Sequence, residues 1–485
     1  MNLNQVDNVH IIGIGGCASS AIAELLVSNG INVTGSEMKY RSGLSYLEDM
    51  GIIIKYSHAK ENIYNNDKSP DILLYSPAIT ALNPDNPEIL EAKRVNIPTM
   101  SWQMFIGNYL NSIGKTGITV SGSEGKGTTA GILTIILKGT KYDPLAILGA
   151  KIKNIDKESS SNIYFGRGDS YILEADEFNR NFHSYHPSIN IMVNFKYEHP
   201  ETYKNFDEYK ESFYNYFKGM NDNKTLILRA TNDIIDFINE YKLLEKFKII
   251  LYKDENIKSD IECNYTIIDH EINECGNFFK LKDNNDSTND FHLPVLPGFM
   301  AENAAGAIIA AIELGVDIET IKKNLLNFKG MVRRFDLYKT GNNGIFITDY
   351  GHSPESIDHI TKEIKSIFKD RKIHIIFQPH LFSRTYNFFD KFVEALKKAD
   401  RVSLIDIYPA RENPAEWENK VSSFAMYKKL KETGTDVYYA GKAGEINKNL
   451  HDKIDESEVS CFIGAGDMDL YYPELFEAFG TESYF

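Results

Sequence analysis

Short apolar runs of strand length alternate with amphipathic runs of helix length along most of the chain. Near the N-terminus, VHIIGIGG at 9–16 predicts a buried strand that ends in glycines, and SSAIAELLVSNG at 19–30 predicts a helix with one apolar face. INVTGSE at 31–37 and DILLYSPAI at 71–79 predict two further buried strands. A strand, a helix and a second strand in this order form a βαβ unit, so this first block predicts a parallel sheet.

A second block follows the same pattern in the middle of the chain. Residues 117–137 predict a strand, a loop and a helix, and AENAAGAIIAAIELG at 301–315 predicts another helix. Two more buried strands are expected at 170–176 and 189–195. Residues 223–296 are mixed and turn-rich, and their pattern predicts no order of elements.

A third block fills the C-terminal part of the chain. Amphipathic helices such as SIDHITKEIKSIF at 356–368 alternate with four apolar strands. These strands are expected at 344–351, 372–380, 401–409 and 459–466. Because alternating strands and helices form parallel sheets with both faces covered, the chain predicts an α/β fold in three parts.

Composition and charge limit the partners and the compartment. The 485 residues carry a net charge of −15, which argues against nucleic acids and anionic membranes as partners. It leaves room for an anionic substrate, which a few local cations and helix N-termini can bind. The sequence begins without a signal peptide and contains no run of about 18 apolar residues, so we expect a cytoplasmic protein without a membrane span. The four cysteines are scattered and show no CxxC spacing, which supports neither a zinc knuckle nor a disulfide framework.

A glycine turn joins the first strand to the first helix. Gly13, Gly15 and Ala18 fit the pattern G-x-G-x-x-A, in which backbone amides face a pyrophosphate with the help of the helix dipole. Glu37 follows the second strand, where a carboxylate could hold a ribose hydroxyl. On these residues alone the turn indicates an NAD site, and the alternative is a tight turn without a ligand.

The stretch VSGSEGKGTTAG resembles a phosphate-binding loop. Gly122 and Gly125 let backbone amides approach phosphate oxygens, and Lys126 supplies a positive charge. The next residue is Gly127, where phosphate loops usually carry a Ser or Thr that binds magnesium, and Thr128 offers the nearest hydroxyl. Our hypothesis is a modified but working ATP site, and the alternative is a glycine-rich turn.

Polar side chains gather at the ends of the predicted strands in the second and third blocks. Glu174-Ala-Asp-Glu177 ends one strand, and Asn194 and His199 follow the next; together they suit Mg²⁺, which prefers carboxylates and substrate phosphates. Asp349, His352, His380, Arg384 and Asp467 likewise follow apolar strands of the third block, a pattern that predicts an anion-binding cleft. Taken singly, each of these residues could be an ordinary hydrogen-bonded side chain.

Taken in order, these stretches resemble the Mur ligase family over nearly the whole chain. The matching stretches are HIIGIGGCASSAIAELL, SPAITALNPDNPEI, EADEFNRNFHSYHP, VNFKYEHPETY, GMVRRFD, DYGHSPES, FQPHLFSRT, IYPAREN and GAGD. Two of them, FQPHLFSRT and IYPAREN, favour the branch of the family that adds L-alanine to UDP-N-acetylmuramate. The resemblance replaces NAD by UDP as the expected ligand of the first glycine turn.

The resemblance implies three domains and one reaction. It implies a Rossmann-like UDP-substrate domain at 1–114, a central P-loop ATPase domain at 115–330 and a Rossmann-like C-terminal domain at 331–485. The family forms an amide bond at the expense of ATP, with Mg²⁺ as cofactor. The muramate carboxylate attacks the γ-phosphate to give an acyl phosphate, which the amino group of the amino acid then displaces.

The resemblance also implies roles for individual residues. The implied catalytic residues are Lys126, Glu174, His199, Arg333, His352, His380 and Arg384. The implied ATP-binding residues are Gly122, Ser123, Gly125, Lys126, Gly127, Thr128, Asn303 and Asp349. The implied UDP-binding residues are Gly13, Gly15, Gly16, Ser36 and Ser76, and the implied metal ligands are Glu174, His199 and Thr128. Among these, Lys126 and Arg333 would contact phosphates, whereas Asn303 would face the adenine and Asp349 the ATP ribose. His352, His380 and Arg384 would shape the muramate and amino-acid site.

Several departures from the family pattern keep alternatives open. Gly127 replaces the family's Thr, Glu124 stands where the alanine-adding branch usually has His, and Leu381 stands where many members have Arg. We expect UDP-N-acetylmuramate and a small amino acid as substrates, and a monomer or homodimer. The alternatives are a murein-recycling ligase that adds a peptide, a related ligase with another acceptor, and a binding protein that keeps the fold without turnover.

Overall fold

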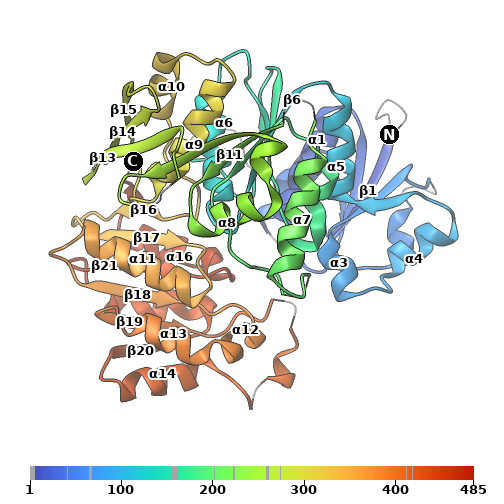
Figure 1. Cartoon of the computed structure of the whole chain (residues 1–485). Coiled ribbons are helices and arrows are strands. Elements are labelled where there is room, and N and C mark those ends of the chain that lie inside the picture. The colour runs from blue at the N-terminus through green and yellow to red at the C-terminus, as the bar shows by residue number, and fades with distance from the viewer. Residues whose placement is uncertain are drawn as a thin grey trace. The chain divides into compact units, whose positions relative to one another are not determined.

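The computed structural model describes residues 6–40, 42–64, 68–153, 155, 162–200, 202–221, 224–257, 261–273, 275–410, 412–417 and 419–484. The chain forms three sheets with helices between the strands, which confirms the predicted α/β fold (Figure 1). It divides into two compact units. The first unit holds residues 1–271, 278–293 and 299–328, and the second holds 272–277, 294–298 and 329–485. The first unit contains two of the sheets, and the predicted domain boundaries at 114 and 330 stay predictions.

The first sheet is parallel throughout and has the strand order β3-β2-β1-β4-β5. Its strands are β1 (Asn8–Ile12), β2 (Asn32–Ser36), β3 (Ile53–Lys55), β4 (Ile72–Tyr75) and β5 (Thr99–Ser101). The helices of this region are α1 (Cys17–Ser28), α2 (Ser45–Asp49), α3 (Pro77–Leu82), α4 (Pro87–Arg94) and α5 (Trp102–Ser112). The βαβ prediction is confirmed.

The strand predicted at 71–79 is too long. β4 ends at Tyr75, and Pro77 takes the first turn of α3. The proline ring fixes φ near the helical value and removes an N–H that a sheet would need, so Pro77 favours the start of a helix over the continuation of a strand.

The second sheet has ten strands in the order β15-β14-β13-β12-β11-β10-β6-β9-β7-β8. Its first five strands in the chain are β6 (Thr116–Ser121), β7 (Leu145–Ile147), β8 (Ile163–Phe165), β9 (Ser170–Glu174) and β10 (Ile189–Met192). The other five are β11 (Thr225–Arg229), β12 (Lys248–Asp254), β13 (Tyr265–Asn273), β14 (Gly276–Asp283) and β15 (Thr288–Leu293). The strands β11 to β15 account for the region that the sequence pattern left without order.

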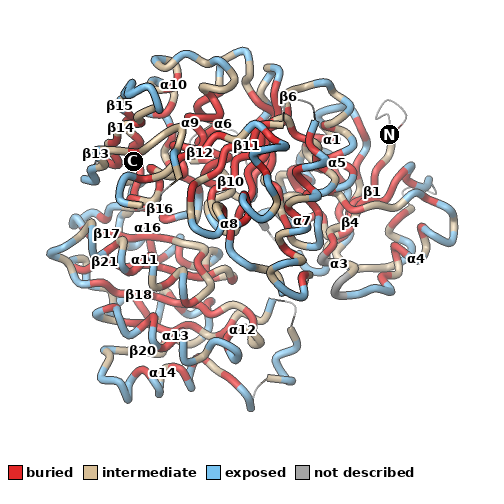
Figure 2. Tube along the Cα trace, in the orientation of Figure 1, coloured by how far each residue is buried: buried red, intermediate tan, exposed pale blue. Residues whose placement is uncertain are grey.

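Helices follow the strands of the second sheet and cover it. They are α6 (Lys126–Leu137), α7 (Phe206–Lys218), α8 (Asn232–Tyr241), α9 (Met300–Glu313) and α10 (Ile318–Leu325). α6 and α9 pack side by side, and both are buried along most of their length (Figures 1 and 2). The strand–loop–helix unit and the later helix are therefore confirmed.

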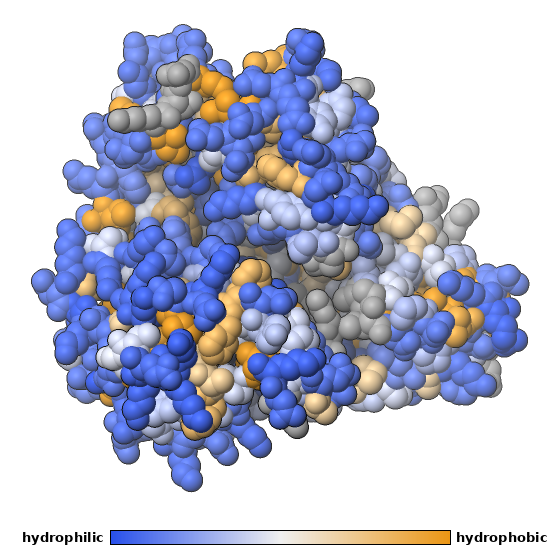
Figure 3. Space-filling view, turned by 60° about the horizontal axis from the view of Figure 1, so that its bottom comes forward, coloured by the Kyte–Doolittle hydropathy of each residue, from blue (hydrophilic) through white to orange (hydrophobic). Residues whose placement is uncertain are grey.

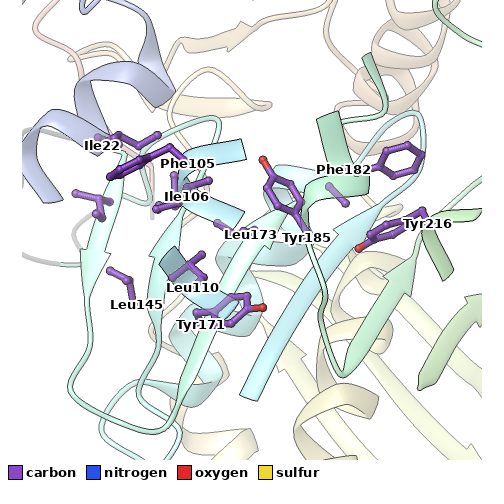
Figure 4. Close-up of a cluster of buried hydrophobic side chains, with 14 of the residues drawn as sticks. Ile22, Phe105, Ile106, Leu110, Leu145, Tyr171, Leu173, Phe182, Tyr185 and Tyr216 are labelled. Atoms are coloured by element: carbon purple, nitrogen blue, oxygen red, sulfur yellow. The ribbon is translucent and has the colours of Figure 1, made fainter. Parts of the chain in front are cut away.

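One hydrophobic cluster joins the first two sheets. Phe105 and Leu110 of α5 belong to the same buried cluster as Leu173 of β9 and as Phe182 and Tyr216 farther along the chain (Figure 4). All five side chains are at most 3% exposed. Burying apolar surface from both sheets in one cluster stabilises them together, because neither sheet can separate without exposing it to water.

The second unit contains a seven-stranded sheet in the order β20-β19-β18-β21-β17-β16-β22. Its strands are β16 (Asp336–Lys339), β17 (Ile345–Asp349), β18 (Ile373–Phe377), β19 (Arg401–Ile405), β20 (Asp436–Gly441), β21 (Val459–Ile463) and β22 (Glu482–Ser483). The helices include α11 (Pro354–Ile367), α12 (Phe382–Asn387), α13 (Phe389–Leu396), α14 (Ser423–Glu432), α15 (Ile446–Leu450) and α16 (Tyr472–Ala478). The strands from β20 to β17 are parallel, whereas β16 runs antiparallel to both neighbours.

Both faces of this third sheet are covered. Ile375 of β18 lies in one hydrophobic cluster and Ile376, the next residue, lies in another. Successive side chains of a strand point to opposite faces, so the two clusters lie on opposite sides of the sheet. This is the arrangement predicted from the alternating strands and helices.

Figure 3 shows a face on which hydrophilic side chains predominate and apolar ones are scattered. Among the described helices, none has the length and hydropathy needed to cross a membrane.

The close approach of α5 to the second sheet's loops predicts the effect of a small substitution. A Cβ on Gly107 would overlap the carbonyl group of Ser184, whose carbon would lie 2.9 Å away. An alanine in an unobstructed helix gains about 1 kcal/mol over glycine, but Gly107→Ala should instead lower the free energy of unfolding by about 1–3 kcal/mol. Urea unfolding of the full chain measures this, with Asn108→Ala at the exposed neighbouring position as control. A Gly107→Ala protein as stable as the control would contradict the close packing.

Candidate active site

The first glycine turn is held tightly against the end of β2. The N–H groups of Gly13 and Ile14 donate to the carbonyl oxygen of Ser36 over 2.9 and 3.2 Å, and the φ of Gly13 is +73°. The N–H of Gly15 donates to the carboxylate of Glu37 over 3.1 Å, and a Cβ on Gly15 would lie 2.6 Å from that carboxylate. The left-handed backbone conformation at Gly13 therefore favours glycine, whereas a Cβ at Gly15 would have to displace the carboxylate of Glu37.

The other predicted UDP-binding residues lie at the same edge of the sheet. Gly16 is the N-cap of α1, and Ser76 is the N-cap of α3 directly after β4. The parallel pairing of β1 with β4 sets Ile12 opposite Tyr75, so the chain leaves both strands at the same level. The structure thus brings Gly13, Ser36 and Ser76 to one edge.

The side chain of Ser36 is buried below the turn. Its hydroxyl is fully buried and donates to the carboxylate of Glu88 over 2.7 Å. Glu88 also lies within hydrogen-bond distance of His10 Nε2 (2.9 Å), His58 Nδ1 (3.0 Å) and Asn62 Nδ2 (3.1 Å). Burial alone would raise the pKa of Glu88, but the hydrogen bonds from His10 and His58 outweigh it and lower the pKa to about 2. Ser36 therefore faces the turn through its carbonyl group and the buried carboxylate through its hydroxyl.

The phosphate-binding loop lies between β6 and α6 and is fixed to the end of β10. Gly122 and Gly125 have φ values of +119° and +84°. The side-chain oxygen of Asn194 accepts hydrogen bonds from the N–H groups of Ser123 (2.6 Å) and Glu124 (3.1 Å). A Cβ on Gly122 would lie 2.7 Å from the carbonyl oxygen of Asn194. The sequence placed Asn194 in the metal group, whereas the structure shows that it holds the loop.

Lys126 begins α6 and is enclosed by oxygen atoms. Its ammonium group donates to the carbonyl of Gly122 over 2.5 Å and pairs with the carboxylate of Glu177 at 3.1 Å. Burial by itself would lower the pKa of Lys126, but the charges of Glu177, Asp176 and Glu198 outweigh it and raise the pKa. The lysine is therefore charged at neutral pH, as a phosphate ligand must be.

The space beside Gly127 is filled by Glu174. A Cβ on Gly127 would lie 3.0 Å from Glu174 Oε1, and the N–H of Gly149 donates to the same carboxylate. Thr128, the next residue of α6, is 5% exposed. The loop thus lacks a hydroxyl at Gly127, and the carboxylate of Glu174 lies close to this position. It approaches the N-terminus of α6, where negative charge is favoured.

A group of potential metal ligands lies beside this loop. One side-chain ligand atom from each of Glu177, Glu198 and His199 lies within 4.8 Å of the other two. Burial, the largest effect, raises the pKa of Glu198, and the nearby charge of Lys126 opposes it. Carboxylate oxygens and an imidazole nitrogen are ligands that divalent cations accept. Of these three residues, the sequence had predicted only His199 as a metal ligand, together with Glu174 and Thr128.

Asn303 borders the same loop. It lies in the first turn of α9 and is 7% exposed. A Cβ on Gly125 would lie 2.9 Å from its side-chain oxygen. The residues predicted for ATP and metal within the first unit therefore gather around one loop.

In the second unit, Arg333 and Asp349 order the segment before β16. The guanidinium of Arg333 donates to Asp469 over 2.6 Å and to the carbonyl of Gly464 over 2.7 Å, and it lies 5.0 Å from the ring centre of Tyr350. The two carboxylate oxygens of Asp349 accept from the N–H groups of Phe335 and Gly351 over 2.8 and 2.7 Å. Both predicted ATP-binding side chains are held in place by the unit's own residues.

The two predicted histidines and the arginine do gather. Arg384 donates to His380 Nδ1 over 3.3 Å, and the ring centres of His380 and His352 are 6.1 Å apart. The ring of Tyr408 stacks on His380 at 5.7 Å. Burial, with a contribution from the charge of Arg384, lowers the pKa of His352 to about 4. The group combines a neutral imidazole with a fixed positive charge, which suits an anionic ligand with an amine.

Glu412 caps the helix that carries Arg384, and the sequence pattern did not reveal this contact. Its carboxylate accepts hydrogen bonds from the N–H groups of Phe382 and Ser383, the first two residues of α12. A carboxylate at this position caps the helix and opposes the partial positive charge of its N-terminus. Glu412 belongs to the stretch IYPAREN, of which Arg411 lies outside the described residues. Asp467, the last polar residue predicted at a strand end, accepts from Gln378 over 2.8 Å.

Three family models match successive parts of the chain. They are the Mur ligase family catalytic domain at residues 8–112, the Mur ligase middle domain at 120–311 and the Mur ligase glutamate ligase domain at 333–466. The matched ranges contain every residue that the sequence singled out for a site except Asp467, which directly follows the last of them.

Known proteins resemble the chain over nearly its full length. The UDP-N-acetylmuramate–L-alanine ligase of Aquifex aeolicus is 31% identical over 99% of both chains. The crystal structure of the UDP-N-acetylmuramate–alanine ligase MurC from Thermotoga maritima matches with a TM-score of 0.80 and 25% identity, and covers 97% of this chain and 98% of its own. A murein peptide ligase from Psychrobacter arcticus shares the fold with a TM-score of 0.70, 19% identity and 98% coverage of both chains.

The environment of His352 predicts an unusual titration. Its imidazole should titrate near pH 4, and Arg384→Gln should raise that pKa towards 6.5 because a nearby positive charge is removed. Because the folded pKa lies below that of the unfolded chain, this residue should also lower the free energy of unfolding as the pH falls from about 6.5 to 4. NMR of histidine-labelled protein measures the pKa, with Arg371→Gln as a control elsewhere in the unit. Titration of the wild-type His352 near pH 6.5 would show that the group is not buried beside Arg384.

Proposed function

The chain belongs to the Mur ligase family, and we propose that it joins L-alanine to the carboxylate of UDP-N-acetylmuramate, with hydrolysis of ATP to ADP and phosphate, in cytoplasmic peptidoglycan synthesis. The observation that carries this proposal is the 31% identity to a ligase of that name over 99% of both chains. We take the first 114 residues as the UDP-substrate domain, 115–330 as the ATPase domain and 331–485 as the C-terminal domain. The chain acts as a monomer or homodimer in this proposal.

The first glycine turn supports binding of the UDP diphosphate. Gly13, Gly15 and Gly16 lie at the N-terminus of α1, where N–H groups and the helix dipole favour an anion. The N–H of Gly15 donates a hydrogen bond to the carboxylate of Glu37, which shows that this N–H can bind an anionic group. Ser76 lies at the neighbouring strand end and would contribute to the same site.

The phosphate-binding loop supports ATP binding and the first chemical step. The muramate carboxylate attacks the γ-phosphorus, the bond to the β,γ-bridging oxygen breaks, and ADP leaves. Lys126 is charged and positioned, so it can stabilise the negative charge that moves onto the leaving oxygen. A divalent cation such as Mg²⁺, held by Glu174 and His199 with Thr128 nearby, would neutralise part of the triphosphate charge. The cluster of Glu177, Glu198 and His199 fits such an ion by its donor atoms.

The histidine–arginine group of the second unit supports binding of the amino acid. The amine of alanine attacks the acyl phosphate carbon, a tetrahedral intermediate forms, and inorganic phosphate leaves as the amide forms. His352 is neutral at physiological pH and can accept a hydrogen bond from the amine. Arg384, held beside His380, would bind the amino-acid carboxylate. The roles of Arg333, Asn303 and Asp349 towards ATP stay predictions.

A second candidate function is the addition of a peptide in place of alanine. The murein peptide ligase of Psychrobacter arcticus shares the fold over 98% of both chains, and Leu381 stands beside the proposed amino-acid group. A larger acceptor would need more room at that position. Because Gly127 alters the phosphate-binding loop, ATP turnover by this chain should also be measured.

Acceptor specificity separates these functions. Phosphate release with ATP, Mg²⁺ and UDP-N-acetylmuramate should depend on L-alanine, with glycine or L-serine slower by roughly 10-fold or more, since one small group changes kcat/KM by that order. A tripeptide that begins with L-alanine should support no turnover. Turnover only with the tripeptide would replace the proposal by the peptide-adding function. No turnover with any acceptor would favour the alternative of a binding protein that keeps the fold without turnover.

Loss of the loop lysine should separate turnover from substrate binding. Lys126→Ala should lower kcat by about 10²–10³, the effect of removing one preorganised charge donor, while the KM for L-alanine stays unchanged. Lys138→Ala at the other end of α6 is the matched control and should keep wild-type kcat. An unaltered kcat in Lys126→Ala would mean that the loop does not hold the reacting phosphates.

A further inference from the structure

We propose that Glu88 is a positioning residue for the UDP diphosphate, which it orders through Ser36 without touching the substrate. The sheet holds the backbone of Ser36, and Glu88 holds its hydroxyl and so helps to fix the carbonyl group on which the glycine turn rests. This inference rests on the proposed function, because it assumes that the first glycine turn binds UDP.

The connection from Glu88 to the turn consists of two successive sets of hydrogen bonds. The hydroxyl of Ser36 donates to Glu88 over 2.7 Å, and the carbonyl of Ser36 accepts from the N–H groups of Gly13 (2.9 Å) and Ile14 (3.2 Å). Both functional groups of one serine are thereby used, one towards the buried carboxylate and one towards the turn. A shift of Ser36 would therefore disturb both hydrogen bonds that the turn donates to its carbonyl oxygen.

Glu88 is well suited to act as a fixed point. Its side chain is fully buried, and it lies within hydrogen-bond distance of donors from His10, Ser36, His58 and Asn62. His10 comes from β1 and Ser36 from β2. His58 precedes the 3-10 helix at Lys60–Ile63, which contains Asn62, whereas Glu88 itself lies in α4. A buried charge is tolerated only with such a complete set of partners, so all of these elements are held in one arrangement.

The opposite side of the turn carries a carboxylate of a different kind. Glu37 accepts from the N–H of Gly15 but is partly exposed to solvent. Glu37 can therefore give way to a phosphate, whereas Glu88 is enclosed and its oxygens are fully used. Glu37 therefore occupies the turn, and Glu88 supports it through Ser36.

A purely structural role for Glu88 makes a different prediction. If the buried network only stabilised the fold, its loss would lower the melting temperature and leave UDP affinity intact in the protein that remains folded. If it positions the turn, affinity for the diphosphate falls while the other substrates bind as before. The effect of Glu88 should also disappear once Ser36 has lost the hydroxyl through which it acts.

The experiment measures UDP-N-acetylmuramate binding to the full-length protein by calorimetry and the KM of each substrate by phosphate release. The variants are Glu88→Gln, Ser36→Ala and the double variant, with Glu91→Gln as control. Glu91 lies in the same helix, and its carboxylate is also hydrogen-bonded, to Tyr64 and Arg94. Ser36→Ala removes one hydroxyl and no backbone group, so it keeps the test open if Glu88→Gln folds poorly.

Glu88→Gln and Ser36→Ala should each raise the Kd for UDP-N-acetylmuramate by roughly 10-fold, the size of effect that supporting residues around a bound group commonly have. The Kd of the double variant should equal that of the single variant that binds more weakly, instead of showing the product of the two effects. The KM values for ATP and L-alanine and all constants of Glu91→Gln should stay at wild-type values. Wild-type Kd in both single variants, or multiplied effects in the double variant, would overturn the inference and leave the proposed function standing. Absence of UDP-N-acetylmuramate binding by the wild type would overturn the proposed function and the inference together.

Discussion

The parallel pairing of strands decides where this protein can do chemistry. The backbone hydrogen bonds between β6 and β9 set Val120 opposite Glu174, and those between β6 and β10 set Ser121 opposite Met192. Neighbouring strands therefore end at the same level, and the chain that leaves them must turn within a few residues. The phosphate-binding loop, the carboxylate of Glu174 and the segment before His199 meet because of this register. The same constraint brings the glycine turn and Ser76 to one edge of the first sheet.

Negative charge is in excess around the phosphate-binding loop. Lys126 faces the carboxylates of Glu177, Asp176 and Glu198, which together raise its pKa. A triphosphate would add further negative charge to a partly buried region where charges interact strongly. A bound cation would lower the electrostatic cost of binding the nucleotide, and the nucleotide would do the same for the cation, so their binding would be coupled.

What the sequence revealed and what it concealed follow from the range of the interactions. Strands, glycine turns and the loop lysine are local features, so a few neighbouring residues predict them. Pro77 is a local feature too, but the apolar residues around it have the pattern of a strand, so the predicted strand extended too far. Glu88 follows a helix-capping asparagine and its sequence context indicates only a helix start, since its partner His10 is 78 positions away. Arg333 and Asp469 are 136 positions apart, so no local pattern could pair them.

The hydrophobic cluster shared by the first two sheets has a consequence for how the chain is made. The first sheet is complete in the sequence once α5 ends at Ser112, but the cluster that covers α5 includes Phe182 and Tyr216. Ribosomes add about 5–20 residues per second, so the apolar face of α5 waits on the order of 5–20 s for these partners to emerge. During that interval the nascent chain exposes a face that the finished protein buries. This interval is where a chaperone on the ribosome would have the most effect on the yield of folded protein.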